Sequence, residues 1–410
     1  MLFKDKIKKL IPLFLLDFYH YALAFIGAVI FGFPGRKLIV IGVTGTSGKS
    51  TTVDFITRIL EEPFDSAQGK AGNKVVSNSS IRFKIGENEK PNDKKMGMPG
   101  RFFMQKLLWL GVKEKCKYAV LEVTSEGIKQ YRHKFINFDC AVFTNLSPEH
   151  IESHGSFEKY RKEKLKLFKA TKYLHVINID DGNAKYFLDI PAKKIVTFGL
   201  NKGDFNLKNT DFHLNILGNF NLYNALAAIA VVTLYGIYLE ISKKALEKVR
   251  GIPGRMEIIQ KEPFLVVVDY AHTPVQLEEV YKSLEGKNLI CVLGSCGGGR
   301  DKWKRPVLGK IASQYCREVI ITNEDPYDEN PMQIIKEVAS GIKHPKPNTQ
   351  HLILDRKEAI KKAIAMAKPG NTVIITGKGS ESWMCLEDSK KIPWDDREIT
   401  KEELKSRRNY

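Results

Sequence analysis

The sequence predicts an α/β fold, in which a central domain with a P-loop-type parallel sheet is followed by a Rossmann-like α/β domain. Short apolar runs alternate with helical patterns along the chain, which is typical of parallel sheets. A glycine-rich turn follows the first apolar run directly. The alternation breaks near residues 251–254 and then resumes. We therefore expect a central domain at 38–252 and a C-terminal domain at 253–410, preceded by a helical segment at 1–37.

Apolar runs and amphipathic periods predict the elements in chain order. In the central domain we expect strands at 38–43, 118–123, 140–144 and 174–179, and helices at 50–60, 157–169 and 221–235. In the C-terminal domain we expect strands at 264–269, 289–293, 319–322 and 372–376. Residues 62–100 are rich in Gly, Asn and Lys, which favours loops and short hairpins.

The N-terminal segment combines basic and apolar residues. Lysines at positions 4, 6, 8 and 9 precede a mostly apolar stretch at 10–33, and no signal-peptide cleavage site follows. Asp17 argues against a membrane span. Two interpretations of this segment remain: it forms a helix that lies at a membrane interface, or it forms a helix that packs on the next domain.

Composition sets broad limits on function. The 410 residues are 43% hydrophobic and 27% charged, as in globular proteins. The net charge of +18 suits anionic substrates, an anionic membrane or nucleic acid, and it also suits a lysine-rich solvated surface. No basic cluster interleaves with aromatic residues, so no nucleic-acid partner is expected. The six cysteines have no zinc-site spacing, which is typical of free thiols in the cytoplasm.

A phosphate-binding loop is the clearest motif. The sequence from Gly42 is Gly-Val-Thr-Gly-Thr-Ser-Gly-Lys-Ser-Thr-Thr, between a predicted strand and a predicted helix. Five residues separate Gly42 and Gly48, one more than in the usual loop. Backbone N–H groups would cradle ATP phosphates, Lys49 would reach the β- and γ-phosphates, and the Ser50 hydroxyl would hold Mg²⁺. The expected ATP contacts here are Gly45, Thr46, Gly48, Lys49, Ser50 and Thr51, which makes the central domain an ATPase domain.

This loop resembles that of the Mur ligases and folylpolyglutamate synthases. Further segments resemble Mur ligase motifs in the same order along about residues 38–405, and they are most similar to UDP-N-acetylmuramyl-tripeptide synthetases. These segments begin at Glu122 (Glu-Val-Thr-Ser-Glu-Gly), Thr144 (Thr-Asn-Leu-Ser-Pro-Glu-His), Gly218 (Gly-Asn-Phe-Asn), Gly254 (Gly-Arg-Met-Glu), Val268 (Val-Asp-Tyr-Ala-His), Gly297 (Gly-Gly-Gly-Arg-Asp-Lys) and Gly377 (Gly-Lys-Gly-Ser-Glu).

The resemblance implies a magnesium site. Its ligands would be Ser50, Glu122, His150 and Lys164, the last as a carbamate formed with CO₂. Composition alone favours a different interpretation of Lys164, namely a surface lysine on a basic helix. The resemblance also makes Lys49, Lys164, His150 and Arg255 the expected catalytic set.

The resemblance further assigns nucleotide and substrate contacts. The remaining ATP contacts would be Asn221, Arg255, Asp269, Tyr270 and His272. A muramoyl-peptide acceptor would meet Ser125, Gln130 and Arg132, although Glu126 stands where the family usually has His. The incoming amino acid would meet Arg300, Glu324, Asp325, Tyr327, Gly377 and Glu381. Tyr327 replaces the Arg of enzymes that add diaminopimelate, and the two acidic residues before it suit a side-chain amine such as that of lysine.

The implied activity is ATP-dependent amide-bond formation through an acyl phosphate, in a monomer that builds peptidoglycan precursors. The sequence lacks the family's usual N-terminal uridine-binding domain, and its closest match to the sugar-contacting motif is residues 97–99. We therefore expect an acceptor held differently, such as a lipid-linked one approached through residues 1–37. Alternatives are a folylpolyglutamate-synthase-like ligase, an amidating Mur-like enzyme, an inactive nucleotide-binding scaffold, and a nucleic-acid-dependent ATPase.

Overall fold

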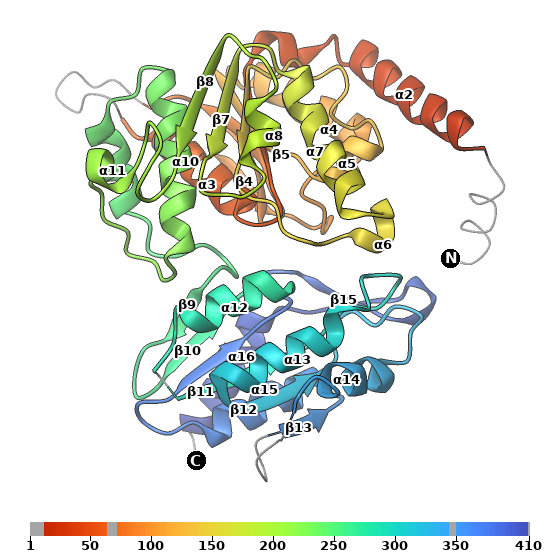
Figure 1. The fold of residues 1–410 in the computed structure, drawn as a ribbon, viewed down its shortest axis with the longest axis vertical. Helices are drawn as coiled ribbons and strands as arrows, with labels where there is room; N and C mark the ends of the chain where they lie inside the picture. The colour runs from red at the N-terminus through yellow and green to blue at the C-terminus, as the bar shows by residue number, and fades with distance from the viewer. Residues whose placement is uncertain (1–11, 64–71, 287, 344–349, 409–410) are drawn as a thin grey trace. The chain divides into compact units, whose positions relative to one another are not determined.

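The computed structural model describes residues 12–63, 72–286, 288–343 and 350–408 (Figure 1). The chain forms two compact units. The first comprises Met1–Pro148, Ser156–Asn215 and Asn219–Arg250, and the second comprises Glu149–Gly155, Ile216–Gly218 and Gly251–Tyr410. The domain boundaries expected from the sequence stay a prediction. Residues 1–11 of the N-terminal segment lie outside the described residues.

An eight-stranded sheet forms the centre of the first unit, in the order β4-β3-β2-β5-β1-β6-β7-β8. The strands are β1 (Ile39–Thr44), β2 (Val75–Asn78), β3 (Arg82–Ile85), β4 (Asn88–Pro91), β5 (Tyr118–Glu122), β6 (Cys140–Phe143), β7 (Leu174–Asn178) and β8 (Lys194–Phe198). Six strands run parallel, while β3 and β4 add an antiparallel edge. The hairpins expected within residues 62–100 are therefore confirmed.

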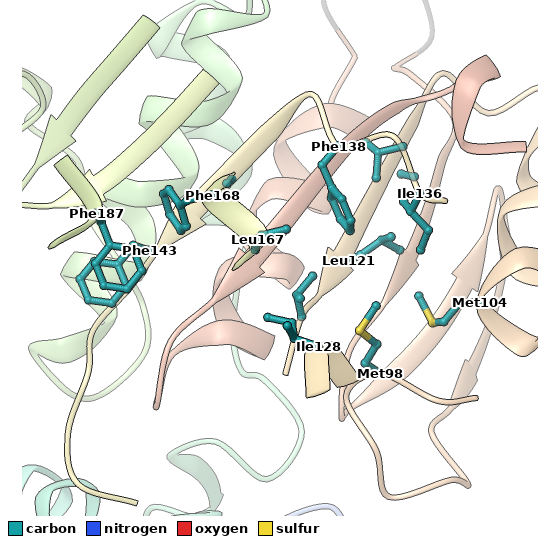
Figure 2. Close-up of a cluster of buried hydrophobic side chains, with 14 of the residues drawn as sticks. Met98, Met104, Leu121, Ile128, Ile136, Phe138, Phe143, Leu167, Phe168 and Phe187 are labelled. Atoms are coloured by element: carbon teal, nitrogen blue, oxygen red, sulfur yellow. The ribbon is translucent and has the colours of Figure 1, made fainter. Parts of the chain in front are cut away.

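Helices accompany this sheet. They are α2 (Leu13–Ile30), the 3-10 turn η1 (Pro34–Lys37), α3 (Lys49–Glu61), α4 (Arg101–Lys113), α5 (Ser125–Lys129), α7 (Phe157–Ala170), α8 (Ala184–Leu188), α9 (Leu207–Thr210), α10 (Phe220–Leu234) and α11 (Leu239–Glu247). A buried cluster joins the sheet to α4, α5, α7 and α8 (Figure 2). In it, Phe143 stacks on Phe187 with ring centroids 3.8 Å apart. Burial of these aromatic faces fixes the helices against the sheet and thereby positions the loops at the strand ends.

The second unit has a six-stranded sheet in the order β13-β12-β11-β14-β10-β9. Its strands are β9 (Glu257–Gln260), β10 (Leu265–Val268), β11 (Leu289–Leu293), β12 (Cys316–Thr322), β13 (Gln350–Ile353) and β14 (Thr372–Ile375), with a separate hairpin of β15 (Trp383–Cys385) and β16 (Lys391–Pro393). Its helices are α6 (Ile151–His154), α12 (Pro274–Lys282), α13 (Lys304–Tyr315), α14 (Pro331–Ala339), α15 (Arg356–Met366), η2 (Glu387–Ser389) and α16 (Asp396–Arg408). Five strands are parallel and β9 is antiparallel to β10. In open parallel sheets ligands bind at the carboxyl ends of the strands, so the turns after β10, β11, β12 and β14 are the expected site.

Within the described residues, no helix has the length and apolar character required to cross a membrane. The α2 helix confirms that residues 13–30 of the N-terminal segment are helical and pack on α4 of the first unit.

Candidate active site

The phosphate loop lies where the sequence predicts, between β1 and the first turn of α3. Gly48 caps α3 with a φ of 78°, and a Cβ there would lie 2.3 Å from Asn224 Oδ1, so this position requires glycine. Lys49 Nζ donates to the Thr46 carbonyl at 2.9 Å. The amide N–H groups at the start of α3 and the Lys49 ammonium together make an anion-binding turn.

Asn145 closes this loop, and the expected site residues did not include it. Its side-chain oxygen accepts hydrogen bonds from Ser47 N at 2.9 Å and Ser47 Oγ at 3.0 Å, while its carbonyl accepts one from Thr46 N at 2.9 Å. Asn145 follows β6, which is paired with β1 so that Thr44 lies opposite Phe143. Its place in the Thr-Asn-Leu motif was the signal in the sequence that could have identified it.

Glu122 and Ser50 form a buried oxygen cluster beside the loop. Ser50 Oγ donates to Glu122 Oε2 at 2.7 Å, and Ser80 N donates to the same oxygen at 2.9 Å. Ser80 Oγ lies 2.7 Å from Ser50 Oγ. The parallel register sets Glu122 opposite Val43, at the carboxyl end of β1. Ser80 was absent from the predicted set, because no motif in the sequence marks it.

This donor set suits magnesium. Mg²⁺ prefers oxygen ligands, and it usually takes one or two protein groups together with water and phosphate oxygens. One carboxylate and two hydroxyls next to a phosphate loop match that chemistry. Among the residues that the structure describes, no three His, Cys, Asp or Glu side chains cluster as a metal site.

Lys164 points into the phosphate loop. Its side chain is 1% exposed, and Nζ donates to the Gly45 carbonyl at 2.7 Å. The Tyr160 ring lies beneath it, 4.6 Å from Nζ, and the Tyr160 hydroxyl is 3.1 Å from Thr46 Oγ1. The interpretation of Lys164 as a surface lysine is therefore wrong, whereas its carbamylation stays a prediction.

The residues expected to hold the acceptor gather around α5. Arg132 Nη2 donates to Gln130 Oε1 at 2.8 Å, and Arg132 Nη1 donates to the Met98 carbonyl. Ser125 is the buried first residue of α5. A Cβ at Gly97 would lie 2.3 Å from Glu122 Oε1, so the 97–99 segment passes directly over the oxygen cluster. Met98 itself is anchored in the core (Figure 2).

Asn221 is joined to the phosphate-loop helix through Asn224. Asn221 Oδ1 accepts a hydrogen bond from Asn224 Nδ2 at 3.1 Å, and Asn224 Oδ1 accepts one from Thr52 Oγ1 at 3.3 Å. Asn221 is buried at the start of α10, which packs on α3. The first unit thus brings together Gly45, Thr46, Gly48, Lys49, Ser50, Thr51, Glu122, Lys164 and Asn221.

The other predicted residues lie in the second unit. Asp269 follows β10, and its two oxygens accept hydrogen bonds from Met256 N at 2.7 Å and Ala271 N at 2.6 Å. Burial raises the pKa of Asp269, while Arg255 and the two backbone donors oppose that shift. The Arg255 guanidinium lies over the Tyr270 ring, with Cζ 4.2 Å from the centroid. Asp269 therefore shapes the turn, and its contact with ATP stays a prediction.

His150 belongs to the short segment Glu149–Gly155 of the second unit. Asp301 holds this segment by accepting hydrogen bonds from Ile151 N at 3.3 Å and Glu152 N at 2.9 Å. Glu149 Oε1 lies 3.3 Å from His272 Nε2. Burial alone would raise the pKa of Glu149, but the positive charges of His272 and Lys304 outweigh it and hold this pKa well below its ordinary value. The role of His150 as a metal ligand stays a prediction.

A buried lysine connects the residues expected to bind the amino acid. Lys378 Nζ lies 2.8 Å from both Asp325 Oδ1 and Glu381 Oε2, and donates to the Trp383 carbonyl at 2.6 Å. Tyr270 donates to the other Glu381 oxygen at 3.0 Å. Asp325 thus forms a salt bridge with a protein cation, whereas Glu324 forms none within the part of the chain that the structure describes.

Glu324 lies next to Cys296 and the glycine loop. Cys296 Sγ donates to Glu324 Oε1 at 2.8 Å, whereas the buried Oε2 has no hydrogen-bond partner within the described ranges. A Cβ at Gly377 would lie 2.3 Å from that oxygen. Burial alone would lower the pKa of Arg300. Its neighbours raise that pKa by more than burial lowers it, and they are Cys296, Tyr327, Tyr270 and Glu381. The guanidinium therefore stays charged. The Arg300 guanidinium, the buried Glu324 carboxylate and the Tyr327 phenol thus add to the Lys378 ion-pair network at the predicted amino-acid site.

Two family descriptions match the chain. Residues 43–232 match the Mur ligase middle domain, and residues 254–379 match the Mur ligase glutamate ligase domain. A UDP-N-acetylmuramoyl-L-alanyl-D-glutamate--2,6-diaminopimelate ligase of Syntrophomonas wolfei is 35% identical over 413 residues, which cover 94% of this chain and 82% of the relative. A UDP-N-acetylmuramyl-tripeptide synthetase of Roseiflexus is 35% identical over 418 residues, which cover 92% and 80%.

Solved structures have the same fold. A UDP-N-acetylmuramoyl-L-alanyl-D-glutamate--2,6-diaminopimelate ligase has a TM-score of 0.58 at 30% identity, covering 90% of this chain and 79% of its own. The MurF ligase of Thermotoga maritima, solved with ADP, has a TM-score of 0.65 at 18% identity, covering 95% and 84%. The second likeness supports the fold only. Together, the two matched domains and the relatives show that this chain belongs to the Mur ligases, ATP- and magnesium-dependent enzymes that form carbon–nitrogen bonds.

Proposed function

We propose that this chain adds an amino acid to the terminal carboxylate of a muramoyl peptide in the cytoplasm, as a step of peptidoglycan precursor synthesis. The observation that carries the proposal is a phosphate loop whose Gly45 carbonyl accepts a hydrogen bond from the buried Lys164, next to a Ser50 that donates one to the buried Glu122. It occurs in a chain 35% identical to ligases whose names state this reaction. A scaffold without activity would have no need to keep a lysine and a glutamate buried at that loop.

The first step forms an acyl phosphate. Lys49 and the loop N–H groups hold the triphosphate, while Ser125, Gln130 and Arg132 orient the acceptor peptide. The acceptor carboxylate attacks the γ-phosphorus, the bond to the β-phosphate oxygen breaks, and ADP leaves. Ser50 and Glu122 would hold the magnesium ion, which would supply positive charge to neutralise the phosphates. Arg255 is the expected guanidinium partner of the transferring phosphoryl group. These hydrogen-bond donors are already in place before the reaction, so they lower its barrier without a rearrangement of the protein.

The second step forms the amide. The amine of the incoming amino acid attacks the acyl carbon, the bond from that carbon to the phosphate oxygen breaks, and the proton that the amine loses leaves with inorganic phosphate. Arg300 would hold the α-carboxylate, since a guanidinium can bind it through two parallel hydrogen bonds. Lys378 and Tyr270 orient the Glu381 carboxylate, so it can accept a hydrogen bond from the ammonium group before attack.

Glu324 favours an incoming amino acid that carries a second positive charge. A buried carboxylate with one unpaired oxygen binds a cation with little additional desolvation of its own. Tyr327 offers only a neutral phenol where a distal carboxylate would need a cation. We therefore propose lysine, or another diamino acid without a charged distal carboxylate, as the substrate.

The test measures amino-acid-dependent phosphate release with ATP and Mg²⁺, using UDP-linked and lipid-linked muramoyl dipeptide, and identifies products by mass. We expect a basic amino acid to give product, and Glu324→Gln to raise its KM at least about tenfold while neutral amino acids stay poor substrates. Product with diaminopimelate alone would contradict the assignment of the amino acid. Phosphate release that no amino acid and no acceptor accelerates would contradict the ligase itself. Product from the lipid-linked acceptor alone would identify the carrier.

We also propose that Lys164 is carbamylated, because a carboxylate-like group there would complete the oxygen-rich surroundings of the metal. Incubation with ¹³C-bicarbonate should give a carbamate signal in the NMR spectrum that Lys164→Arg removes, together with a loss of about 100-fold or more in kcat. Lys166→Arg is the matched control, because Lys166 lies on the same helix but is exposed and paired with Glu163 at 2.7 Å. Full activity of Lys164→Arg would rule out the carbamate.

A further inference from the structure

Helix α2 exposes most of its described large apolar residues and buries three of its four small ones. Phe18 is 69% exposed and Ile30 is 62% exposed. Ala24 and Ala28 are buried, at 2% and 0%. This arrangement is the reverse of an ordinary surface helix, which turns its large apolar side chains toward the core. The exposed large side chains of α2 are those of Leu15, Phe18, Tyr19, Tyr21, Phe25, Ile26, Val29 and Ile30.

The small residues allow α2 to lie close to α4. A Cβ at Gly27 would be 3.6 Å from the Phe102 ring and 3.7 Å from Gln105. Arg101 at the start of α4 forms a hydrogen bond with His20. The Tyr21 ring meets the Phe135 ring edge-on, with centroids 5.2 Å apart. These contacts hold the helix in one rotation about its axis, so its outer face is a fixed feature of the first unit.

The outer face has no charged residue. At 100° per residue, its exposed positions span about half of the helix circumference. Asp17, the one acidic residue in α2, is exposed but lies outside that arc. An 18-residue helix is about 27 Å long, and α2 does not qualify as a membrane span. A long apolar face on a helix that does not span is the geometry of a helix lying in the plane of a membrane interface.

Basic residues precede and follow α2 in the sequence. Arg36 and Lys37 are exposed directly after the helix. The sequence just before it, outside the described residues, carries lysines at positions 4, 6, 8 and 9. Each lysine or arginine near an anionic surface adds to the electrostatic attraction. A second copy of this chain, with its own net charge of +18, would bring like charges together at the same face.

We propose that the outer face of α2 docks on an anionic lipid bilayer, with Phe18, Ile26 and Ile30 inserted at the level of the headgroups. This attachment is independent of the ligase reaction. It brings the enzyme to the membrane surface.

The test is cosedimentation with vesicles of phosphatidylglycerol and phosphatidylcholine, compared with phosphatidylcholine alone. We expect binding to the anionic vesicles that weakens with salt, and a fall of roughly tenfold or more in the partition coefficient of Phe18→Glu/Ile26→Glu. The control is Tyr173→Glu/Tyr238→Glu, which adds the same charge at exposed aromatic positions of the same unit. Its partition coefficient should stay within twofold of the wild-type value. Ligation of soluble substrates without vesicles should be equal in all three proteins, which separates this test from that of the reaction.

Two outcomes would overturn the proposal. In the first, wild type and Phe18→Glu/Ile26→Glu bind the anionic vesicles equally, so that the lysines alone account for attraction. In the second, the wild type does not bind vesicles and analytical ultracentrifugation shows a dimer that this variant dissociates, so that the face is covered by a second copy.

Discussion

His133 is a buried histidine next to α5 in the first unit. Its side chain is 3% exposed, and burial, assisted by the charges of Lys134 and Lys166, lowers its pKa from 6.5 to about 3. The folded state therefore holds a neutral imidazole, whereas the unfolded chain takes up a proton below pH 6.5. Because the unfolded state binds the additional proton, stability present above pH 6.5 is lost as the pH falls toward 3.

We predict that replacing His133 removes this acid sensitivity. Between pH 7 and pH 4 the free energy of unfolding of the wild type should fall by a few kcal/mol more than that of His133→Met, since a pKa unit corresponds to about 1.4 kcal/mol. Urea denaturation followed by fluorescence at several pH values measures it. His213→Met, at an exposed position, should retain the wild-type profile. Parallel profiles for the wild type and His133→Met would show that His133 is not buried in its neutral form.

Lys164 shows at the same scale why one residue in a charged run cannot be judged by composition. Lys162 and Lys166 on the same helix are exposed, while Lys164 is 1% exposed. The difference arises because the helix turns by 100° per residue, so position 164 faces the sheet together with Tyr160 and Leu167. The periodicity predicts that inward face, but the partner at Gly45 lies 119 residues away and depends on the tertiary fold.

Helices α15 and α16 are joined by a buried ion pair between Arg356 and Asp396. Arg356 Nε donates to Asp396 Oδ1 at 2.9 Å, and its Nη2 lies 2.7 Å from Oδ2. The same guanidinium donates to the carbonyls of Asn323 at 3.2 Å and Thr376 at 2.8 Å. Those two residues directly precede Glu324 and Gly377, so the ion pair positions both loops of the predicted amino-acid site.

We predict that Arg356→Met destabilises the second unit by about 3–5 kcal/mol, because it leaves the buried Asp396 carboxylate unpaired. It should also raise the KM for the amino acid more than the KM for ATP, since the two loops lose a shared anchor. The matched control is Lys357→Met at the next position, which removes an exposed pair with Glu402 and should change neither quantity measurably. A loss of stability with equal changes in both KM values would mean that the pair supports folding alone.

Most strands that the sequence left out lie at sheet edges or next to them, whereas β2 is third from the edge of its sheet. β8, β9 and β13 are edge strands, and β13 has no fully buried residue. An edge strand pairs on one side only and keeps polar side chains, so it lacks the apolar run that marks a central strand. By contrast, β1, β5, β6 and β7 lie within one or two residues of their predicted bounds, because burial on both faces requires continuous apolar residues.

At the scale of the whole molecule, the chain distributes the reaction between two units. The first carries the phosphate loop, the oxygen cluster and the acceptor residues, and the second carries the residues expected to bind the amino acid. The net charge of +18 suits a protein whose substrates are ATP and a peptide carboxylate, and the same charge favours an anionic membrane beneath α2. Composition alone could not distinguish binding of anionic substrates from binding of an anionic membrane. The distinction depends on whether the lysines and arginines lie beside the substrate sites or beside an exposed apolar face.

The sequence by itself determined the phosphate loop, the order of the family motifs and the alternation of strands and helices, since these depend on neighbouring residues and on short periods. Only the tertiary structure decided that Ser80 and Asn145 complete the loop, that Asp325 is bound by Lys378, and that α2 turns its large side chains outward. Those outcomes depend on contacts between residues far apart in the chain. Burial and hydrogen-bond pairing are properties of such contacts, and no local pattern encodes them.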